Sequence, residues 1–246
     1  MAGRAGARRW LLDLPVDAVT LPEAAAWVLD AARAGGYRLV VTLNPEIVVG
    51  ARADPALRSA LQAADLSVAD GVGVALAARL RGMPLPARVP GVDLVAETLR
   101  RGGADVSVFF LGGRPGVAEA AARTASDRFG CHVAGFRHGY FARPAEVPAV
   151  CAEVADSGAQ LLLAGLGPGQ ERFLFENRAA LGPLVAIGVG GSLDVLAGRV
   201  RRMPAWSSRL GVEWLLRVGF DPGRWHRIPS LFRFAWLALT DRTRGN

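Results

Sequence analysis

The chain has 246 residues, of which 51% are hydrophobic and 21% charged, a balance typical of a folded globular protein rather than a disordered one. All 29 basic residues are arginine, which excludes a P-loop kinase because its phosphate loop needs a lysine. Cys131 and Cys151 have no CxxC or Cys/His cluster around them, so we expect the protein to reside in a reducing cytoplasm and to have no zinc site. The basic N-terminus meets Asp13 and Asp17 before it reaches signal-peptide length, so no export is expected.

Along the chain, short apolar runs alternate with helix-length amphipathic stretches, as in proteins whose parallel strands are joined by crossover helices. Thr20 to Glu23 forms a capping-box pattern that predicts an early helix, and later helices are predicted over Pro115 to Arg128 and Pro168 to Leu181. The sequence therefore predicts an α/β fold with a mostly parallel, Rossmann-like sheet flanked by helices. The predicted strands are Leu39 to Leu43, Leu66 to Ala69, Val106 to Leu111, Gln160 to Ala164 and Leu184 to Val189.

The composition changes after about Gly198, which divides the chain into an α/β core, residues 1–198, and a helical C-terminal appendage, residues 199–246. The core carries 19 arginines against 19 acidic residues and the appendage 10 against three, so the excess charge lies in the appendage. Its apolar run Leu231 to Leu239 is too short to span a bilayer. Arginine and tryptophan suit an anionic lipid surface, so we expect membrane association, with a packed basic subdomain as the alternative. No nucleic-acid motif supports a nucleic-acid partner. The tryptophans are Trp206, Trp214, Trp225 and Trp236.

Candidate site residues follow the predicted strands, because ligands of open parallel sheets bind beyond the carboxyl ends of the strands. Asp70 follows one strand directly whereas Asp65 precedes it, so Asp70 is the better candidate for a catalytic base. A plain Asp-Gly turn is an equally weighted alternative. Thr42 ends the preceding strand and would lie beside Asp70 if the two strands are neighbours. Asn44, taken alone, fits a helix N-cap best.

Glycine-rich stretches follow the three later strands, and their backbone N–H groups could face a diphosphate, although glycine turns explain them equally well. None has the GxGxxG spacing, which weakens a dinucleotide-binding fold. The chain also lacks the Asp-x-Asp pair that often holds a divalent metal, and its histidines are scattered, so no metal site is expected. Arginine is the natural substitute on a diphosphate. The stretches are Leu111 to Gly116, Gly165 to Gln170 and Gly188 to Asp194.

Taken together, these segments closely resemble the WecG/TagA/CpsF group of bacterial glycosyltransferases, from about Leu39 to Pro229. So many motifs in order are far more specific than any single glycine pattern. The motifs are Thr-Leu-Asn-Pro-Glu46, Ala-Asp-Leu-Ser-Val-Ala-Asp70-Gly-Val-Gly73, Arg-Val-Pro-Gly-Val-Asp93, Phe-Leu-Gly-Gly113, Gly-Leu-Gly-Pro-Gly-Gln-Glu171, Gly-Val-Gly-Gly-Ser-Leu-Asp194 and Gly-Val-Glu-Trp-Leu-Leu-Arg217.

The resemblance implies an inverting transfer, without a metal or other cofactor, in cell-envelope polysaccharide synthesis. An N-acetylmannosamine-type sugar would pass from a UDP-sugar to N-acetylglucosamine on a polyprenyl diphosphate, at the inner face of the cell membrane. Carried over by position, Asp70 is the general base and Thr42 positions the reacting groups. Self-association in solution is also implied.

The resemblance further implies a nucleotide-sugar pocket and an appendage that folds over it. Two other classes remain open at this point, a nucleotide-binding oxidoreductase and a non-catalytic scaffold of an envelope-assembly complex. The implied pocket residues are Asn44, Arg88, Gln170 and Asp194, with the loop glycines Gly112, Gly113, Gly190 and Gly191, and the implied diphosphate-stabilising residues are Arg217, Arg224 and Arg227.

Overall fold

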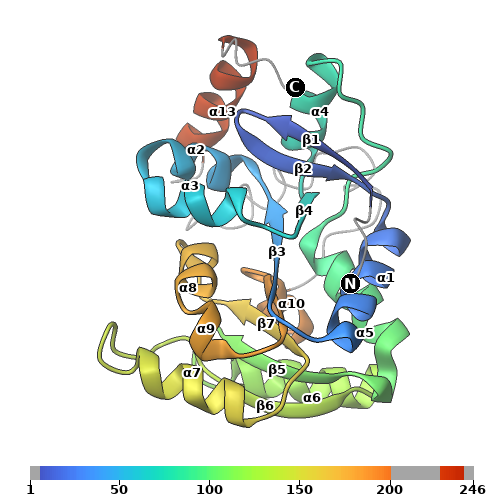
Figure 1. The fold of residues 1–246 in the computed structure, drawn as a ribbon, viewed down its shortest axis with the longest axis vertical. Coiled ribbons are helices and arrows are strands. Elements are labelled where there is room, and N and C mark those ends of the chain that lie inside the picture. The colour runs from blue at the N-terminus through green and yellow to red at the C-terminus, as the bar shows by residue number, and fades with distance from the viewer. Residues whose placement is uncertain (1–5, 201–227, 241–246) are drawn as a thin grey trace.

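The computed structural model describes residues 6–200 and 228–240 (Figure 1). A six-stranded parallel sheet forms its centre, in the order β4-β3-β8-β7-β5-β6. The predicted α/β class is therefore confirmed, and each of the predicted strands is present with its ends shifted by one residue at most. The strands are β3 (Arg38–Leu43), β4 (Leu66–Ala69), β5 (Ser107–Gly112), β6 (His132–Arg137), β7 (Leu161–Gly165) and β8 (Val185–Gly188).

Strand β6 was not predicted because its sequence has no continuous apolar run. It lies at the edge of the sheet and is only partly buried. Gly135 within it lies against the ring of Phe109, so closely that an added Cβ would come 2.5 Å from Cε2 of Phe109. Glycine thus permits the close approach of this edge strand to β5.

The N-terminal segment forms an antiparallel hairpin of β1 (Ala7–Leu11) and β2 (Leu14–Ala18). Its two turn residues, Leu12 and Asp13, have φ of 53° and 63°, values that Asn-Gly or Asp-Gly usually take in such hairpins. Because Leu-Asp stands there instead, the sequence lacks the usual hairpin signature. Buried Asp17 attaches the hairpin to β4. Its carboxylate accepts hydrogen bonds from Arg8 Nε at 2.8 Å and from the Ser67 N–H at 2.8 Å.

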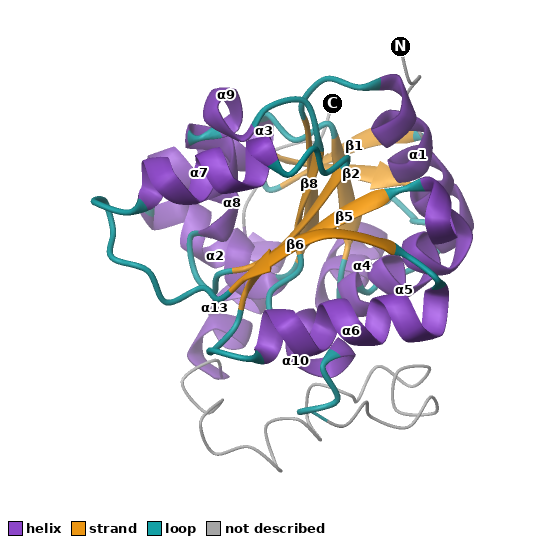
Figure 2. Cartoon of the chain, turned by 90° about the horizontal axis from the view of Figure 1, so that it is seen from below, coloured by secondary structure: helices purple, strands orange, loops and turns teal. Residues whose placement is uncertain are grey.

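Helices cover both faces of the sheet (Figure 2), and the strand side chains alternate between two apolar clusters. Leu39, Val41 and Leu43 belong to the first cluster and Val40 to the second. The first face is covered by α2 (Pro45–Ala53), α3 (Pro55–Gln62), α7 (Val147–Asp156), α8 (Gln170–Glu176) and α9 (Arg178–Leu181), and the second by α1 (Leu21–Ala34), α5 (Gly91–Gly102), α6 (Val117–Phe129) and α10 (Ser192–Leu196).

The helix predictions are confirmed in position and corrected in extent. The capping box of α1 is present, with the Thr20 N–H donating to the Glu23 carboxylate at 2.8 Å. Helix α6 begins two residues later than predicted because Gly116 takes a left-handed conformation, with φ of 83°. The single helix predicted over residues 168–181 is divided at Asn177, whose side chain donates to the Phe173 carbonyl at 2.8 Å.

From the C-terminal appendage the structure describes α13 (Ile228–Thr240), which packs on α2 and on α4 (Val72–Leu80). Phe234 and Ala238 are its buried residues. Within the described ranges, no helix combines the length and the hydropathy needed to cross a membrane. Trp206, Trp214 and Trp225 lie outside the described residues.

Candidate active site

The sequence predicts that Thr42 lies beside Asp70 if their two strands are neighbours. In the structure these strands, β3 and β4, are neighbours. Parallel strands β3 and β4 pair with Thr42 opposite Val68, and the ladder continues past β4 because the Asp70 N–H donates to the Leu43 carbonyl at 2.8 Å. Asp70 comes two residues after Val68, so it follows the strand alternation of the sheet face on which Thr42 lies.

The two aspartates that flank β4 have different surroundings. Asp65, at the amino end, accepts a hydrogen bond from the Leu39 N–H at 2.9 Å and lies 3.8 Å from Arg38 Nε. Its carboxylate therefore holds the start of β3 against the start of β4. Asp70 lies at the carboxyl end, the edge at which ligands of such sheets bind.

Thr42 is buried, and its hydroxyl is engaged within the protein. The hydroxyl donates to the Gly188 carbonyl on β8 at 3.1 Å, which ties the ends of the two central strands together. Gly91, the first residue of α5, lies directly over this side chain, since a Cβ added there would come 3.2 Å from Thr42 Cγ2. A threonine hydroxyl can still accept a hydrogen bond while it donates one.

Asn44 is the N-cap of α2, as its position before Pro45 predicts. Its Oδ1 accepts from the N–H groups of Glu46 at 3.0 Å and Ile47 at 3.1 Å. The cap fixes the side chain at the carboxyl end of β3. The NH2 group of the Asn44 side chain takes no part in the cap, so the cap orients these two N–H donors without using them.

Arg88 is brought to the end of β4 by the segment between α4 and α5. The Val89 N–H donates to the Ala69 carbonyl at 2.9 Å. Arg88 and Asp70 are thus the chain neighbours of a hydrogen-bonded pair. The structure therefore brings together the backbones of two residues that are 18 positions apart in the sequence.

Gln170 joins two of the glycine-rich loops. Its buried side-chain carbonyl accepts from the Leu166 N–H at 3.3 Å and from the Gly190 N–H at 3.2 Å. Its amide donates to Oε1 of Glu171 at 2.8 Å. The loops after β7 and β8 are therefore held to each other by one glutamine side chain.

Glu171 was noticed in the sequence only as part of a motif, yet it is the most buried acidic side chain near this edge of the sheet among the described residues. Burial raises the pKa of its carboxyl group, and the hydrogen bond from Gln170 opposes this shift. A Cβ added at Gly188 would lie 2.9 Å from Glu171 Oε1, so the glycine leaves room for this carboxylate. The adjacent Gln-Glu pair after a glycine loop is the signal that could have found it.

The loop glycines make close approaches between neighbouring strands. Gly112 has φ of 137°, and an added Cβ would lie 2.3 Å from the Gly165 carbonyl oxygen. The Gly113 N–H donates to that same carbonyl at 3.0 Å. The backbone N–H groups of Gly113 and Gly190 are thus used inside the protein, as expected for glycine turns. Gly191 precedes α10, and Asp194 lies in the first turn of that helix.

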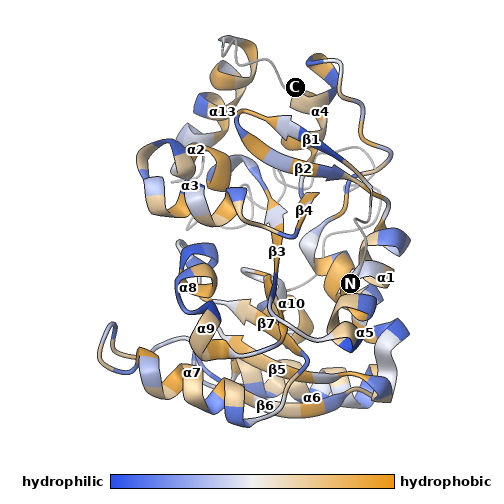
Figure 3. Cartoon of the chain, in the orientation of Figure 1, coloured by the Kyte–Doolittle hydropathy of each residue, from blue (hydrophilic) through white to orange (hydrophobic). Residues whose placement is uncertain are grey.

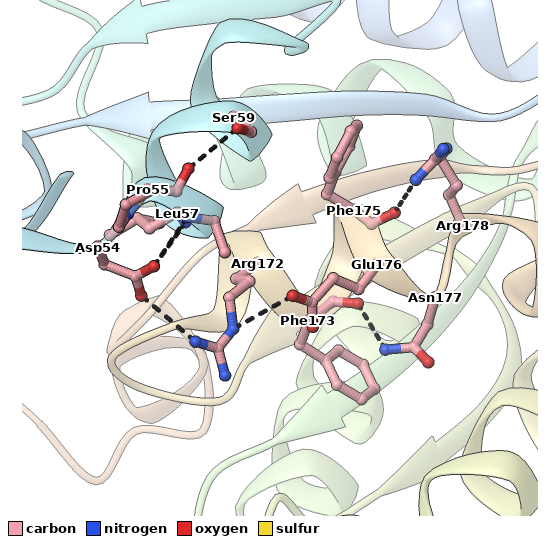
Figure 4. Close-up of polar contacts among 11 residues, drawn as sticks. Asp54, Pro55, Leu57, Ser59, Arg172, Phe173, Phe175, Glu176, Asn177 and Arg178 are labelled. Atoms are coloured by element: carbon pink, nitrogen blue, oxygen red, sulfur yellow. Dashed lines mark hydrogen bonds and ion pairs between the residues drawn. The ribbon is translucent and has the colours of Figure 1, made fainter.

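A polar network on the first face of the sheet fixes α8, the helix that begins with Gln170 (Figure 4). Arg172 lies 3.4 Å from Asp54 and 3.5 Å from Glu176. Asp54 in turn caps α3 through the N–H groups of Ala56 and Leu57, both at 3.0 Å. Arg172 therefore links the start of α3 to α8 at the protein surface.

Arg217, Arg224 and Arg227, the predicted diphosphate-stabilising residues, lie outside the described residues. In the part of the chain that the structure describes, no three His, Cys, Asp or Glu side chains are grouped so that they could hold a metal ion. The predicted site residues that are described lie at or after the carboxyl ends of β3, β4, β5, β7 and β8, and Arg88 lies in the segment between α4 and α5. The paired ends of β3 and β4 bring Thr42, Asn44, Asp70 and Arg88 together.

These features define a doubly wound α/β protein with a polar site at the carboxyl ends of its parallel strands. The model of the Glycosyl transferase WecG/TagA/CpsF family matches residues 9–246, and the chain belongs to this family. It is therefore a glycosyltransferase.

Two relatives carry the same name, N-acetylglucosaminyldiphosphoundecaprenol N-acetyl-beta-D-mannosaminyltransferase. The protein of Bacillus spizizenii is 35% identical over 203 residues, which cover 81% of this chain and 78% of the relative. The protein of Bacillus subtilis is 30% identical over 206 residues, covering 82% and 79%. Both matches thus cover most of each chain.

Proposed function

We propose that the protein transfers an N-acetylmannosamine-type sugar from a UDP-sugar to N-acetylglucosamine carried by a polyprenyl diphosphate. The observation that carries this proposal is the 35% identity to a named transferase over 81% of the chain. The name of that relative states both the sugar and the lipid-linked acceptor. The polar residues gathered at the ends of β3 and β4 give the reaction a site with a carboxylate and a guanidinium.

In the proposed mechanism Asp70 is the general base. Its carboxylate takes the proton of the acceptor hydroxyl while the acceptor oxygen forms a bond to C1 of the donor sugar. The bond between C1 and the diphosphate oxygen breaks on the opposite side of the sugar, and its electron pair leaves with UDP. The anomeric configuration is inverted because the reaction takes place in a single displacement.

The other residues bind and position in this mechanism. Thr42 keeps the end of β3 fixed against β8 through its bond to the Gly188 carbonyl. Asn44, Arg88 and Asp194 contact the nucleotide sugar, and Gln170 sets the distance between two of the loops around it. The diphosphate charge is balanced by arginines, which stay protonated at any working pH, rather than by a metal. The arginines from the appendage are Arg217, Arg224 and Arg227.

A lipid-linked acceptor requires the enzyme to work at a membrane surface. The proposal therefore places the protein in the cytoplasm, peripherally on the inner face of the cell membrane, with residues 199–246 as its membrane contact. Self-association in solution is part of the same proposal. Nucleic acid is not among the proposed partners.

The test is UDP release from a panel of UDP-sugars, with a short-chain polyprenyl-diphosphate N-acetylglucosamine as acceptor and a chelator present. We expect turnover with UDP-N-acetylmannosamine that needs the acceptor and persists in the chelator. Mass spectrometry of the product should show one added N-acetylhexosamine. Turnover that disappears in the chelator would contradict the metal-independent mechanism, and UDP binding without turnover on any donor would favour a scaffold.

A further inference from the structure

Helix α4, which follows the loop of Asp70, and helix α13 of the appendage are packed side by side. Near the start of α4, a Cβ added at Gly73 would lie 3.6 Å from Cε1 of Phe234. Beyond the end of α4, Arg81 donates from Nε to the Ala238 carbonyl at 3.2 Å and from Nη2 to the Leu237 carbonyl at 3.4 Å. The two helices therefore contact each other through residues 234–238 of α13.

Each of these helices carries a stripe of exposed apolar side chains. On α4 the stripe has the spacing i, i+4, i+8, and Leu76 and Leu80 are 54% and 62% exposed. On α13 it has the spacing i, i+4, i+7, and Phe232 and Trp236 are 74% and 63% exposed. Both helices are drawn mainly in orange and pale colours in Figure 3. The stripes consist of Val72, Leu76 and Leu80 on α4 and of Phe232, Trp236 and Leu239 on α13.

Exposed apolar residues gathered in this way indicate an interaction surface, because such residues are otherwise scattered singly over a protein. Elsewhere in the described ranges the large exposed apolar residues are indeed scattered: Trp10 is on β1, Phe136 and Tyr140 are at the opposite edge of the sheet, and Val200 follows α10.

On α4, the loop after it and α13, the charged residues have one sign. From Gly71 to Val92 the sequence contains no acidic residue, and it contains Arg79, Arg81 and Arg88. Helix α13 likewise has no acidic residue and carries the exposed Arg233. Two adjacent helices with exposed apolar residues, arginines, a tryptophan and no carboxylates of their own are suited to the headgroup region of an anionic bilayer.

We propose that α4 and α13 together form one membrane-facing surface, so that the α/β core itself, and not only the appendage, contacts an anionic lipid bilayer. A second copy of the chain is a poor occupant for this surface. A two-fold interface would bring the same arginines face to face without a carboxylate on either helix.

If the protein catalyses the proposed reaction, this surface also affects where the reaction takes place. Helix α4 begins two residues after Asp70. Contact of α4 with lipid therefore holds the carboxyl end of β4 close to the bilayer surface, where the diphosphate of a lipid-linked acceptor lies. The binding surface itself is tested without any sugar, so the two claims fail separately.

The experiment compares the full-length chain with its Leu76→Gln/Leu80→Gln variant in co-sedimentation with phosphatidylcholine vesicles that contain phosphatidylglycerol. Both leucines are exposed, so the exchange leaves the core intact, which a thermal unfolding curve checks. We expect the partition coefficient of the variant to fall about tenfold or more, because two apolar side chains no longer enter the interface. The matched control, Phe136→Gln/Tyr140→Gln, removes two exposed apolar side chains at the opposite edge of the sheet and should bind as the wild type does.

The charge arm uses Arg79→Gln. Vesicle binding should fall by about fivefold with phosphatidylglycerol present and stay unchanged on phosphatidylcholine alone, where there is no anionic attraction to lose. Wild-type vesicle binding by the leucine variant would overturn the proposal. So would a change from dimer to monomer in analytical ultracentrifugation with vesicle binding unaltered, because a second copy of the chain would then be the occupant.

Discussion

Glu171 is an acidic residue placed where a charge is costly. Its carboxyl group is buried beside Gln170 and Gly188, and burial raises its pKa above the ordinary value of 4.5. The native state therefore binds more protons at Glu171 than the unfolded state as the pH rises from about 4.5 to the raised pKa. The contribution of Glu171 to stability is then lost as the pH rises through this window.

Replacement of Glu171 by Gln should remove this loss. The glutamine can still accept the hydrogen bond from Gln170, so the free energies of unfolding of variant and wild type should agree near pH 4. Above that pH the variant should become the more stable of the two. Urea denaturation at a series of pH values measures the difference, and a difference that is independent of pH would contradict the raised pKa.

Gly112 and Gly167 distinguish two reasons for a glycine: lack of space for a Cβ and a backbone conformation with positive φ. Both have positive φ, 137° and 75°, but a Cβ would clash with the Gly165 carbonyl oxygen only at Gly112 and would meet open space at Gly167. We expect Gly167→Ala to cost about 1 kcal/mol in the free energy of unfolding and Gly112→Ala about 3 kcal/mol or more. Equal losses in denaturant unfolding would show that the close approach to β7 is not required.

The individual site residues differ in how far the sequence could predict them. The cap at Asn44 depends on the next three residues only, and it is present as predicted. The partner of the Thr42 hydroxyl lies 146 positions away, and Gly190, one partner of Gln170, lies 20 positions away, on a strand and a loop whose register no local pattern encodes. The sequence therefore indicated these two residues without indicating that their polar groups hold the backbone.

At the scale of elements, Arg81 ties the end of α13 to the core, in addition to the packing of Phe234 and Ala238. Arg81 donates to two carbonyls in the last turn of α13, which have no partners within the helix. Replacement by Gln should loosen this end, so amide hydrogens of α13 should exchange roughly tenfold faster by mass spectrometry.

The control for this exchange experiment is Arg79→Gln, which removes the same charge two residues earlier and leaves the hydrogen bonds of Arg81 in place. Its α13 amides should exchange at the wild-type rate. Faster exchange in both variants would mean that net charge, and not the hydrogen bonds from Arg81, keeps α13 in place.

The strands were predicted far better than their connections. Each predicted strand is a run of buried apolar residues, because the strands of a parallel sheet are covered on both faces. Strand β6 and the β1–β2 hairpin were missed because one is a partly exposed edge strand and the other turns through Leu12 and Asp13. A continuous apolar run indicates a buried strand, so it does not indicate a strand that is only partly buried.

At the scale of the whole molecule, the hairpin packs on the β4 side of the sheet and contains a largely buried ion pair. Arg8 and Asp17 are joined at 2.8 Å, and Asp17 also holds the Ser67 N–H. Asp17→Ala leaves the arginine without its carboxylate, so it should lower the free energy of unfolding by about 3–5 kcal/mol. The exposed pair of Arg33 and Asp30 is the control, and Asp30→Ala should cost under about 1 kcal/mol. Similar losses in urea would contradict this account of the hairpin.

The arrangement of the molecule places three features at one end of β4. Asp70 follows the strand, α4 follows Asp70, and α13 packs on α4. The excess of arginine in the appendage could be read from the sequence. That a core helix shares the exposed apolar surface of the appendage could not, because the contact joins residues more than 150 positions apart.

The central claim is that Asp70 at the carboxyl end of β4 is the base of a glycosyl transfer, and the most direct measurement is kcat for UDP release by Asp70→Asn beside Asp65→Asn. The two substitutions are chemically identical and flank the same strand, and an asparagine at position 65 can still accept from the Leu39 N–H. We predict that kcat falls by about two orders of magnitude or more in Asp70→Asn and stays near the wild-type value in Asp65→Asn. A wild-type kcat in Asp70→Asn would contradict the account and move the base to another residue.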